Sequence, residues 1–191
     1  PCVGVNHASY QVPDTEIDPA AVRIVLISEA APEDPADGYY AEGDPLFQQT
    51  TVRAFRDAGA DVASIADILD LGVYLTTAVK CGKVGYTIRA GPIKQCSLIL
   101  EQELAQFPNV QAYLLMGDAA IRALNYIAKR QGRDRVIPSG STYKIRGGEY
   151  TYGTARAFPS YLQAGPSFFI EKSKRAMIAE DIAAALSLVT R

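Results

Sequence analysis

The stretch RIVLISEAAPEDPADGYY, residues 23–40, decides the fold of this chain. It opens with a short, continuous apolar run at residues 23–27, which predicts a buried central strand. An acidic loop that contains prolines follows at once and places Glu29 where the strand ends. Because burying a carboxylate is costly unless it is paired, Glu29 is either a functional group at a strand end or a group that binds the loop backbone.

Two further apolar runs predict strands, and helical patterns stand between and after them. Strands that alternate with helices indicate a three-layer α/β/α sandwich around a short, mainly parallel sheet. Ligands of such folds gather beyond the carboxyl ends of the strands, which is where Glu29 stands. The expected strands are residues 23–27, 73–79 and 112–116; the expected helices are residues 45–58, 62–71, 92–107, 119–130 and 171–189; a hairpin is expected from residues 143–145 and 150–157, joined through Gly147 and Gly148.

Length and composition are those of an ordinary globular protein, and a single domain is expected over residues 1–191. No apolar run approaches the roughly 20 residues that cross a bilayer, and no secretory signal pattern opens the sequence. We therefore expect a cytoplasmic protein with no membrane partner, and nothing indicates an obligate protein partner.

The net charge of −2 argues against a protein held to DNA by a basic surface all over the molecule. The charges are unevenly placed, however, because residues 16–44 hold eight acids against one base, whereas bases outnumber acids between residues 122 and 156. The second segment is either a local basic surface or a solvated helix end followed by a hairpin.

Four separated segments, in order, resemble the uracil-DNA glycosylase superfamily. They are RIVLISEAAPEDPADG, YLTTAVKC, CSLILEQELAQFPNVQAYLLMGDAAIRAL and FPSYLQAG. The likeness is greatest to the thermostable-type iron–sulfur branch of bacteria and archaea. It implies a DNA-repair enzyme that hydrolyses the N-glycosidic bond of uracil or another damaged base in DNA.

The resemblance assigns candidate site residues. Glu29 occupies the position of the carboxylate that orients the attacking water, a role suited to general-base chemistry. Phe47 is the nearest match to the phenylalanine on which the flipped base stacks, and Tyr39 and Tyr40 are alternates. Phe47 also suits an ordinary position on the buried face of a helix.

The chain departs from the family pattern at two positions. Thr77 stands where the family has the asparagine that reads the uracil edge, and Phe158 replaces the histidine that stabilises negative charge on the leaving base. Removing one such donor typically costs about 10²–10³ in rate. Ser160 and Tyr161 follow in the same motif and are candidates for contacts with the substrate. These departures predict weak or altered uracil excision, which Phe158→His should raise.

Cys2, Cys81 and Cys96 are the three cysteines of the chain. Their odd number argues against a disulfide framework in an intracellular protein. The resemblance implies that they bind a 4Fe–4S cluster with one protein ligand missing, which His7 or an exogenous ligand would replace. The alternative is three buried thiols, since free cysteine commonly packs as a small apolar residue.

Two functions therefore remain open at the level of sequence. The first is a DNA glycosylase with a divergent site, which Glu29 favours. The second is a catalytically inactive relative that binds nucleic acid or a nucleotide-like ligand in the same cleft, which Thr77 and Phe158 favour. An unrelated α/β enzyme acting on a small molecule is a more distant third alternative.

Overall fold

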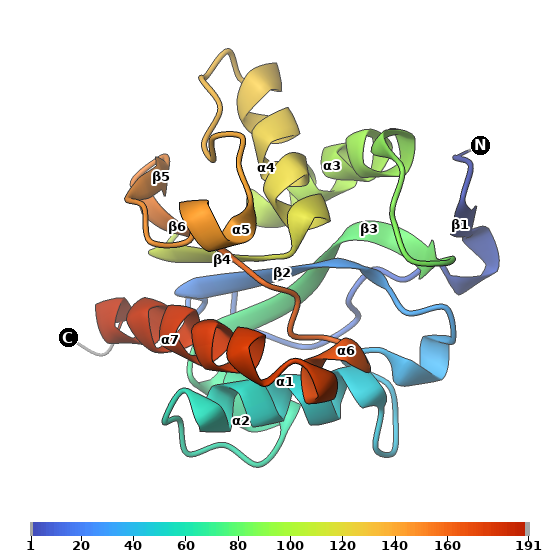
Figure 1. Ribbon diagram of the computed structural model, residues 1–191, viewed down its shortest axis with the longest axis vertical. Helices are drawn as coiled ribbons and strands as arrows, with labels where there is room; N and C mark the ends of the chain where they lie inside the picture. Colours follow the sequence, from blue (N-terminus) through green and yellow to red (C-terminus); the bar gives the residue numbers. More distant parts are fainter. Residues whose placement is uncertain (1, 190–191) are drawn as a thin grey trace.

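A six-stranded sheet lies between two layers of helices in the computed structural model, which describes residues 2–189 (Figure 1). The strand order is β1-β3-β2-β4-β6-β5, and the four inner strands are parallel while both edge strands are antiparallel. The expected three-layer architecture is thereby confirmed. The strands are β1 (Val5–Asn6), β2 (Ile24–Ala31), β3 (Val73–Lys83), β4 (Ala112–Met116), β5 (Tyr150–Tyr152) and β6 (Ala155–Ser160).

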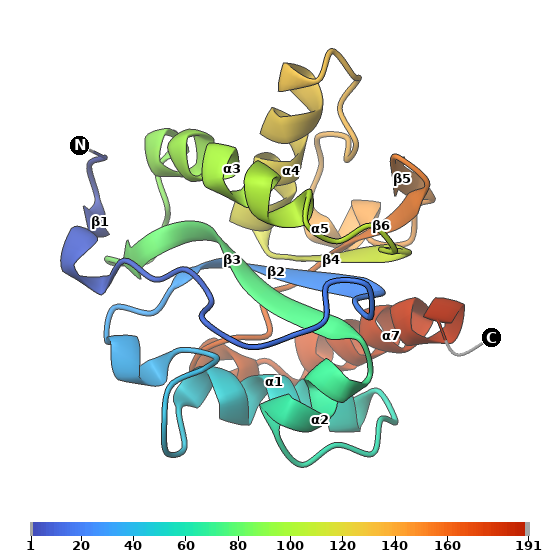
Figure 2. The ribbon, with the colours of Figure 1, turned by 180° about the vertical axis from the view of Figure 1, so that it is seen from behind.

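The longer helices form the two outer layers, as Figures 1 and 2 show. One face of the sheet is covered by α1, α2 and α7, and the other by α3 and α4. The helices are α1 (Leu46–Asp57), α2 (Ile65–Asp70), α3 (Ala90–Leu104), α4 (Asp118–Arg130), α5 (Thr142–Ile145), α6 (Ser167–Ile170) and α7 (Lys172–Val189), with 3-10 turns η1 (His7–Ser9) and η2 (Pro35–Asp37). No helix among these described residues is long and apolar enough to cross a membrane.

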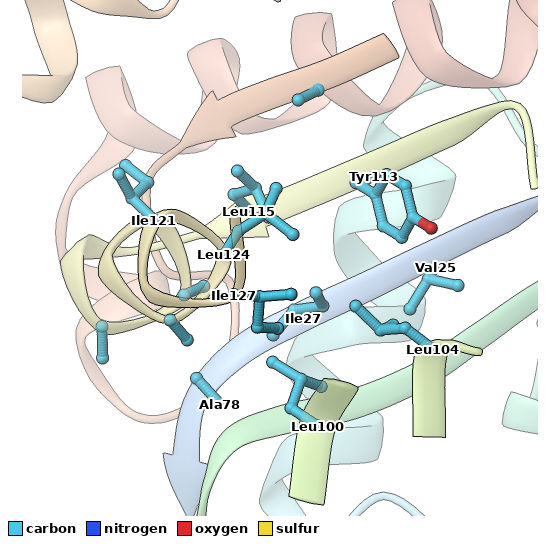
Figure 3. Close-up of a cluster of buried hydrophobic side chains, with 14 of the residues drawn as sticks. Val25, Ile27, Ala78, Leu100, Leu104, Tyr113, Leu115, Ile121, Leu124 and Ile127 are labelled. Atoms are coloured by element: carbon cyan, nitrogen blue, oxygen red, sulfur yellow. The ribbon is translucent and has the colours of Figure 1, made fainter. Parts of the chain in front are cut away.

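Strand β2 forms the centre of the core. Its side chains alternate, so that Val25 and Ile27 pack against α3 and α4 while Ile24 and Leu26 face α1 and α7. Both faces are covered, which explains why this strand reads as an unbroken apolar run. Figure 3 shows the buried cluster on the side of α3 and α4, where Leu100, Leu115 and Leu124 pack around Ile27.

The connections create a switch point beside β2. The chain runs from β2 to β3 on one side through α1 and α2, and then crosses by α3 to β4 on the other side of β2. In an open α/β sheet a crevice opens where the winding reverses, at the carboxyl ends of the strands. Glu29 lies near the end of β2, and Gly117 directly follows β4.

Two local predictions are wrong. Residues 142–145 form the short helix α5 rather than a strand, and the hairpin joins β5 to β6 through Gly153 and Thr154. Gly153 has a φ of +64°, which suits a tight turn and which Gly147 and Gly148 do not adopt. Strand β3 also continues to Lys83, because β1 pairs with its last residues.

Candidate active site

A cavity of about 400 Å³ opens beyond the carboxyl ends of β2 and β4, at the switch point. Helices α4, α6 and α7 and the segment after β3 supply its walls. Its size is within the usual range for small-ligand sites, about 300–1,000 Å³. The residues that matter most for its chemistry are Glu29, Lys83, Gly117, Arg122, Tyr161 and Lys174.

Gly117 leaves the space that the side chain of Glu29 occupies. The glycine has a φ of +98°, and a Cβ there would lie only 2.6 Å from Cγ of Glu29 and 2.9 Å from its Cδ. The backbone N–H of Gly117 also donates to the carbonyl oxygen of Ser160 at 3.0 Å, which ties the ends of β4 and β6 together. The carboxylate of Glu29 therefore lies directly against the backbone that starts α4.

Gly117→Ala is expected to destabilise the fold by about 1–3 kcal/mol through backbone strain and to displace Glu29. Urea unfolding measures the first effect, and base excision measures the second. Gly59→Ala is the matched control, since Gly59 has a φ of +90° with no atom within 4 Å of the added Cβ. Equal losses of stability and activity in the two variants would show that the contact with Glu29 is unimportant.

Lys83 is the cation that pairs with Glu29. Its Nζ lies 3.0 Å from Oε2 of Glu29, and the two side chains are 26% and 18% exposed. The pair is therefore partly shielded from water yet still open to the cavity. Attraction between the charges is stronger here than between fully exposed groups.

Other cations of the cavity have different partners. Arg122 pairs with Asp118 at 3.3 Å, and Arg175 pairs with Asp57 at 2.7 Å. Lys174 binds Glu171, which raises the pKa of the ammonium group, and its Nζ lies 5.4 Å from the ring centroid of Tyr161. Lys83 thus differs from these cations in contacting the candidate catalytic carboxylate.

Other predicted site residues line a second cavity, of about 420 Å³. Burial raises the pKa of Tyr39 to about 12, and it also raises the pKa of Tyr40, whose hydroxyl donates to the carbonyl oxygen of Leu75 at 2.8 Å. The Thr77 hydroxyl donates to the carbonyl oxygen of Val79 at 3.0 Å. These polar groups are therefore already bound by the protein. The predicted residues in this cavity are Tyr39, Tyr40, Phe47 and Thr77.

The sequence predicts that Glu29, Thr77, Phe158 and Ser160 converge on one cleft with Phe47, Tyr39 or Tyr40 on its wall, and this prediction is wrong. Glu29 and Tyr161 line the cavity at the switch point, whereas Phe158 and Ser160 line neither cavity. Strand β6 continues as far as Ser160, so alternation turns Phe158 and Ser160 towards the face covered by α1 and α7. Tyr161, the residue that follows the strand, lines the cavity at the switch point.

Phe158 and Ser160 have structural partners on that face. Ser160 is fully buried and donates to Oδ2 of Asp181 at 2.6 Å. Phe158 is half-buried against the core, with the Arg156 guanidinium 5.4 Å from its ring centroid. A histidine at position 158 would lie away from Glu29, so the expected gain of excision in Phe158→His no longer follows.

Lys83 and Gly117 line the cavity, and the sequence pattern predicts no role for either of them. Gly117 carries a signal in the sequence, because a glycine between an apolar strand and a helix often marks close backbone approach. Lys83 carries no local signal. Its position depends on the pairing of β1 with β3, which extends β3 beyond its apolar run.

The three cysteines and His7 gather at one end of β3. Nδ1 of His7 lies 3.4 Å from Sγ of Cys81, and the backbone N–H of Lys80 donates to Sγ of Cys96 at 3.4 Å. Burial raises the pKa of Cys81, and the nearby thiols of Cys96 and Cys2 add to the rise, so all three lie within electrostatic reach. None is in a disulfide.

Within residues 2–189, no group of three or more side chains of His, Cys, Asp or Glu that could hold a metal ion is found. The cysteines carry the soft sulfur donors that iron–sulfur clusters take.

The fold and cavity define a class of α/β protein with a carboxylate fixed at the switch point of a parallel sheet. The family model described as the Uracil DNA glycosylase superfamily matches residues 15–181. The chain therefore belongs to the uracil-DNA glycosylase superfamily.

Comparison with solved structures finds a wild-type UNG from Nitratifractor salsuginis. The sequence identity is 13%, the TM-score is 0.40, and the match covers 87% of this chain and 75% of the other. The search of curated proteins finds no match.

Proposed function

We propose that this protein is a DNA-repair glycosylase that hydrolyses the N-glycosidic bond of uracil or another damaged base, with weak or altered activity towards uracil. Membership of the superfamily supports the reaction class. The observation that carries the proposal is the carboxylate of Glu29, fixed by Gly117 at the cavity of the switch point.

Glu29 acts as the general base in this mechanism. Departure of the base leaves a positively charged sugar, which needs water delivered to one face. The carboxylate is partly exposed, so a water molecule can reach it from the cavity. It accepts a proton from that water as the oxygen attacks the sugar, a contribution that is typically worth about 10²–10⁴ in rate.

The rim of the cavity supplies groups suited to DNA. Arg122, Lys174 and Arg175 line it and can approach phosphates, although each also pairs with an acid. Tyr86 is 92% exposed and lies at the same cavity, where its ring can stack on a nucleobase. Binding through these groups weakens with rising salt.

The low activity towards uracil follows from what surrounds Glu29. Phe158 provides no proton and no hydrogen bond, and it faces away from the cavity. The chain's single histidine, His7, lies beside Cys81 instead. The Thr77 hydroxyl is bound to Val79. The base is therefore held and released by fewer specific polar groups than in the family pattern.

The test is single-turnover excision from oligonucleotides that carry uracil, hypoxanthine, xanthine or a mismatched base, in single- and double-stranded form. We expect slow excision of at least one of these bases. Binding of the same oligonucleotides without any excision would contradict the proposal.

We also propose that Cys2, Cys81, Cys96 and His7 hold a 4Fe–4S cluster. Nε2 of His7 donates to the carbonyl oxygen of Cys2 at 2.8 Å, and its Nδ1 lies 3.4 Å from Sγ of Cys81. A histidine that binds metal commonly has its second nitrogen held in this way. Such a cluster would join Cys2, which precedes β1, to the last part of β3 and to the middle of α3.

Protein purified without oxygen is expected to be brown and to contain iron. Cys96→Ser should lose the colour and most of the iron, because only two of the three thiolates then remain beside His7 to hold the cluster. His7→Ala should speed the loss of iron in air. Colourless wild-type protein that contains no iron would contradict the cluster.

A further inference from the structure

We propose that Lys83 stabilises the negative charge on the departing base and so replaces the histidine that the family pattern leads one to expect at position 158. This inference rests on the proposed glycosylase function. It goes beyond that function because it names the group that allows the base to leave from a site that holds no histidine.

The Glu29–Lys83 pair matches the charge separation of the reaction. When the N-glycosidic bond breaks, its electron pair leaves with the base, so the sugar becomes positive and the base negative. The carboxylate and ammonium stand 3.0 Å apart in the same cavity. Opposite charges fixed in advance, one for each fragment, stabilise such a transition state more than they stabilise the neutral substrate.

The surroundings of the pair favour this role. The backbone of Gly117 lies against the side chain of Glu29 and limits its movement on that side. Lys83 is the last residue of β3, where pairing with Val5 of β1 holds its backbone. Both side chains are largely shielded from solvent, so the effective dielectric constant between their charges is lower than that of bulk water.

The other cations of the cavity are less suitable. Arg122 and Arg175 are held by Asp118 and Asp57, and Lys174 is held by Glu171 above the ring of Tyr161. Their acidic partners are separate from the water-activating carboxylate. Lys83 is therefore the cation of the cavity that contacts the carboxylate assigned to the water.

The proton balance needs no further reactant. Water adds its oxygen to the sugar carbon and gives one proton to Glu29, while the base leaves as an anion beside Lys83. The lysine remains protonated throughout. The anion then takes up a proton as it enters solvent, and Glu29 releases its own. One water molecule is consumed for each base released.

The experiment compares two leaving groups in single-turnover excision from single-stranded DNA. Fluorine withdraws electrons, so 5-fluorouracil leaves more easily than uracil and depends less on outside stabilisation. Lys83→Gln should slow uracil excision by about 10²-fold and should slow 5-fluorouracil excision much less. Lys83→Arg should retain most of the rate, because the guanidinium keeps the charge.

Lys94→Gln is the matched control, since Lys94 is exposed on α3 away from the cavity. It should leave both rates unchanged, and thermal unfolding should show that every variant is folded. Equal slowing of both substrates by Lys83→Gln, or no slowing, would overturn the role of Lys83 alone. Wild-type protein that excises neither base would overturn this inference, and the proposed function would fall with it only if hypoxanthine, xanthine and mismatched bases are not excised either.

Discussion

Glu29→Gln is expected to reduce base excision by about 10²–10⁴-fold, the usual worth of a positioned general base. The amide has nearly the volume of the carboxylate, so it fits the narrow space beside Gly117. It cannot accept a proton from water, however, and it cannot form an ion pair with Lys83. The loss should therefore appear in the chemical step and leave DNA binding nearly intact.

Single-turnover rates at saturating protein measure the chemical step, and fluorescence anisotropy measures DNA binding. Glu33→Gln is the control, because Glu33 is an exposed acid of the same loop and carries the same change of charge. It should retain the wild-type rate. Glu29→Gln protein that excises bases as fast as wild type would exclude Glu29 as the base.

Lys80→Met is expected to lower the free energy of unfolding more than Gly117→Ala does. Lys80 is fully buried, and its Nζ donates to Oε2 of Glu103 at 2.5 Å and to Oγ1 of Thr76 at 2.7 Å. The other oxygen of Glu103 accepts from the hydroxyls of Tyr74 and Thr76. Burial lowers the pKa of Lys80, and the adjacent Glu103 opposes that shift. Removing the ammonium leaves the buried Glu103 without its cation.

Breaking a buried pair of this kind costs about 3–5 kcal/mol. Urea unfolding should show that loss in Lys80→Met, and Lys80→Met combined with Glu103→Gln should recover part of it because the remaining charge is gone. Arg53→Met is the control, since Arg53 is 57% exposed and pairs with Asp57 on the surface. It should cost at most about 1 kcal/mol. A similar small cost for Lys80→Met would show that the buried pair contributes little.

The sheet was predictable because its inner strands are buried on both faces. Residues 23–27 and 112–116 read as continuous apolar runs for that reason, and both lie in strands. The hairpin was misplaced because it depends on the positive φ of Gly153. Several glycines in residues 140–153 suit a turn equally well by composition, so the pattern alone does not choose among them.

The candidate site was predictable only where chemistry coincides with the end of a strand. Glu29 was identified because it follows an apolar run. The orientation of Phe158 was not predictable, because β6 continues for two residues beyond it through its pairing with β4. Lys83 and Glu29 are 54 positions apart, and their contact depends on the lengths of two strands. The buried pair of Lys80 on β3 and Glu103 on α3 likewise joins two residues that are far apart in the sequence.

Mass spectrometry of the product formed in water labelled with oxygen-18 tests the hydrolytic mechanism most directly. The substrate is an oligonucleotide with one damaged base that the wild-type protein excises. The account predicts one free base for each abasic site and one oxygen-18 atom at the sugar carbon, with both products formed about 10²–10⁴-fold more slowly by Glu29→Gln. Absence of free base for every damaged base, or a released base without label at the sugar when the product is quenched at once, would contradict hydrolysis by water that Glu29 activates.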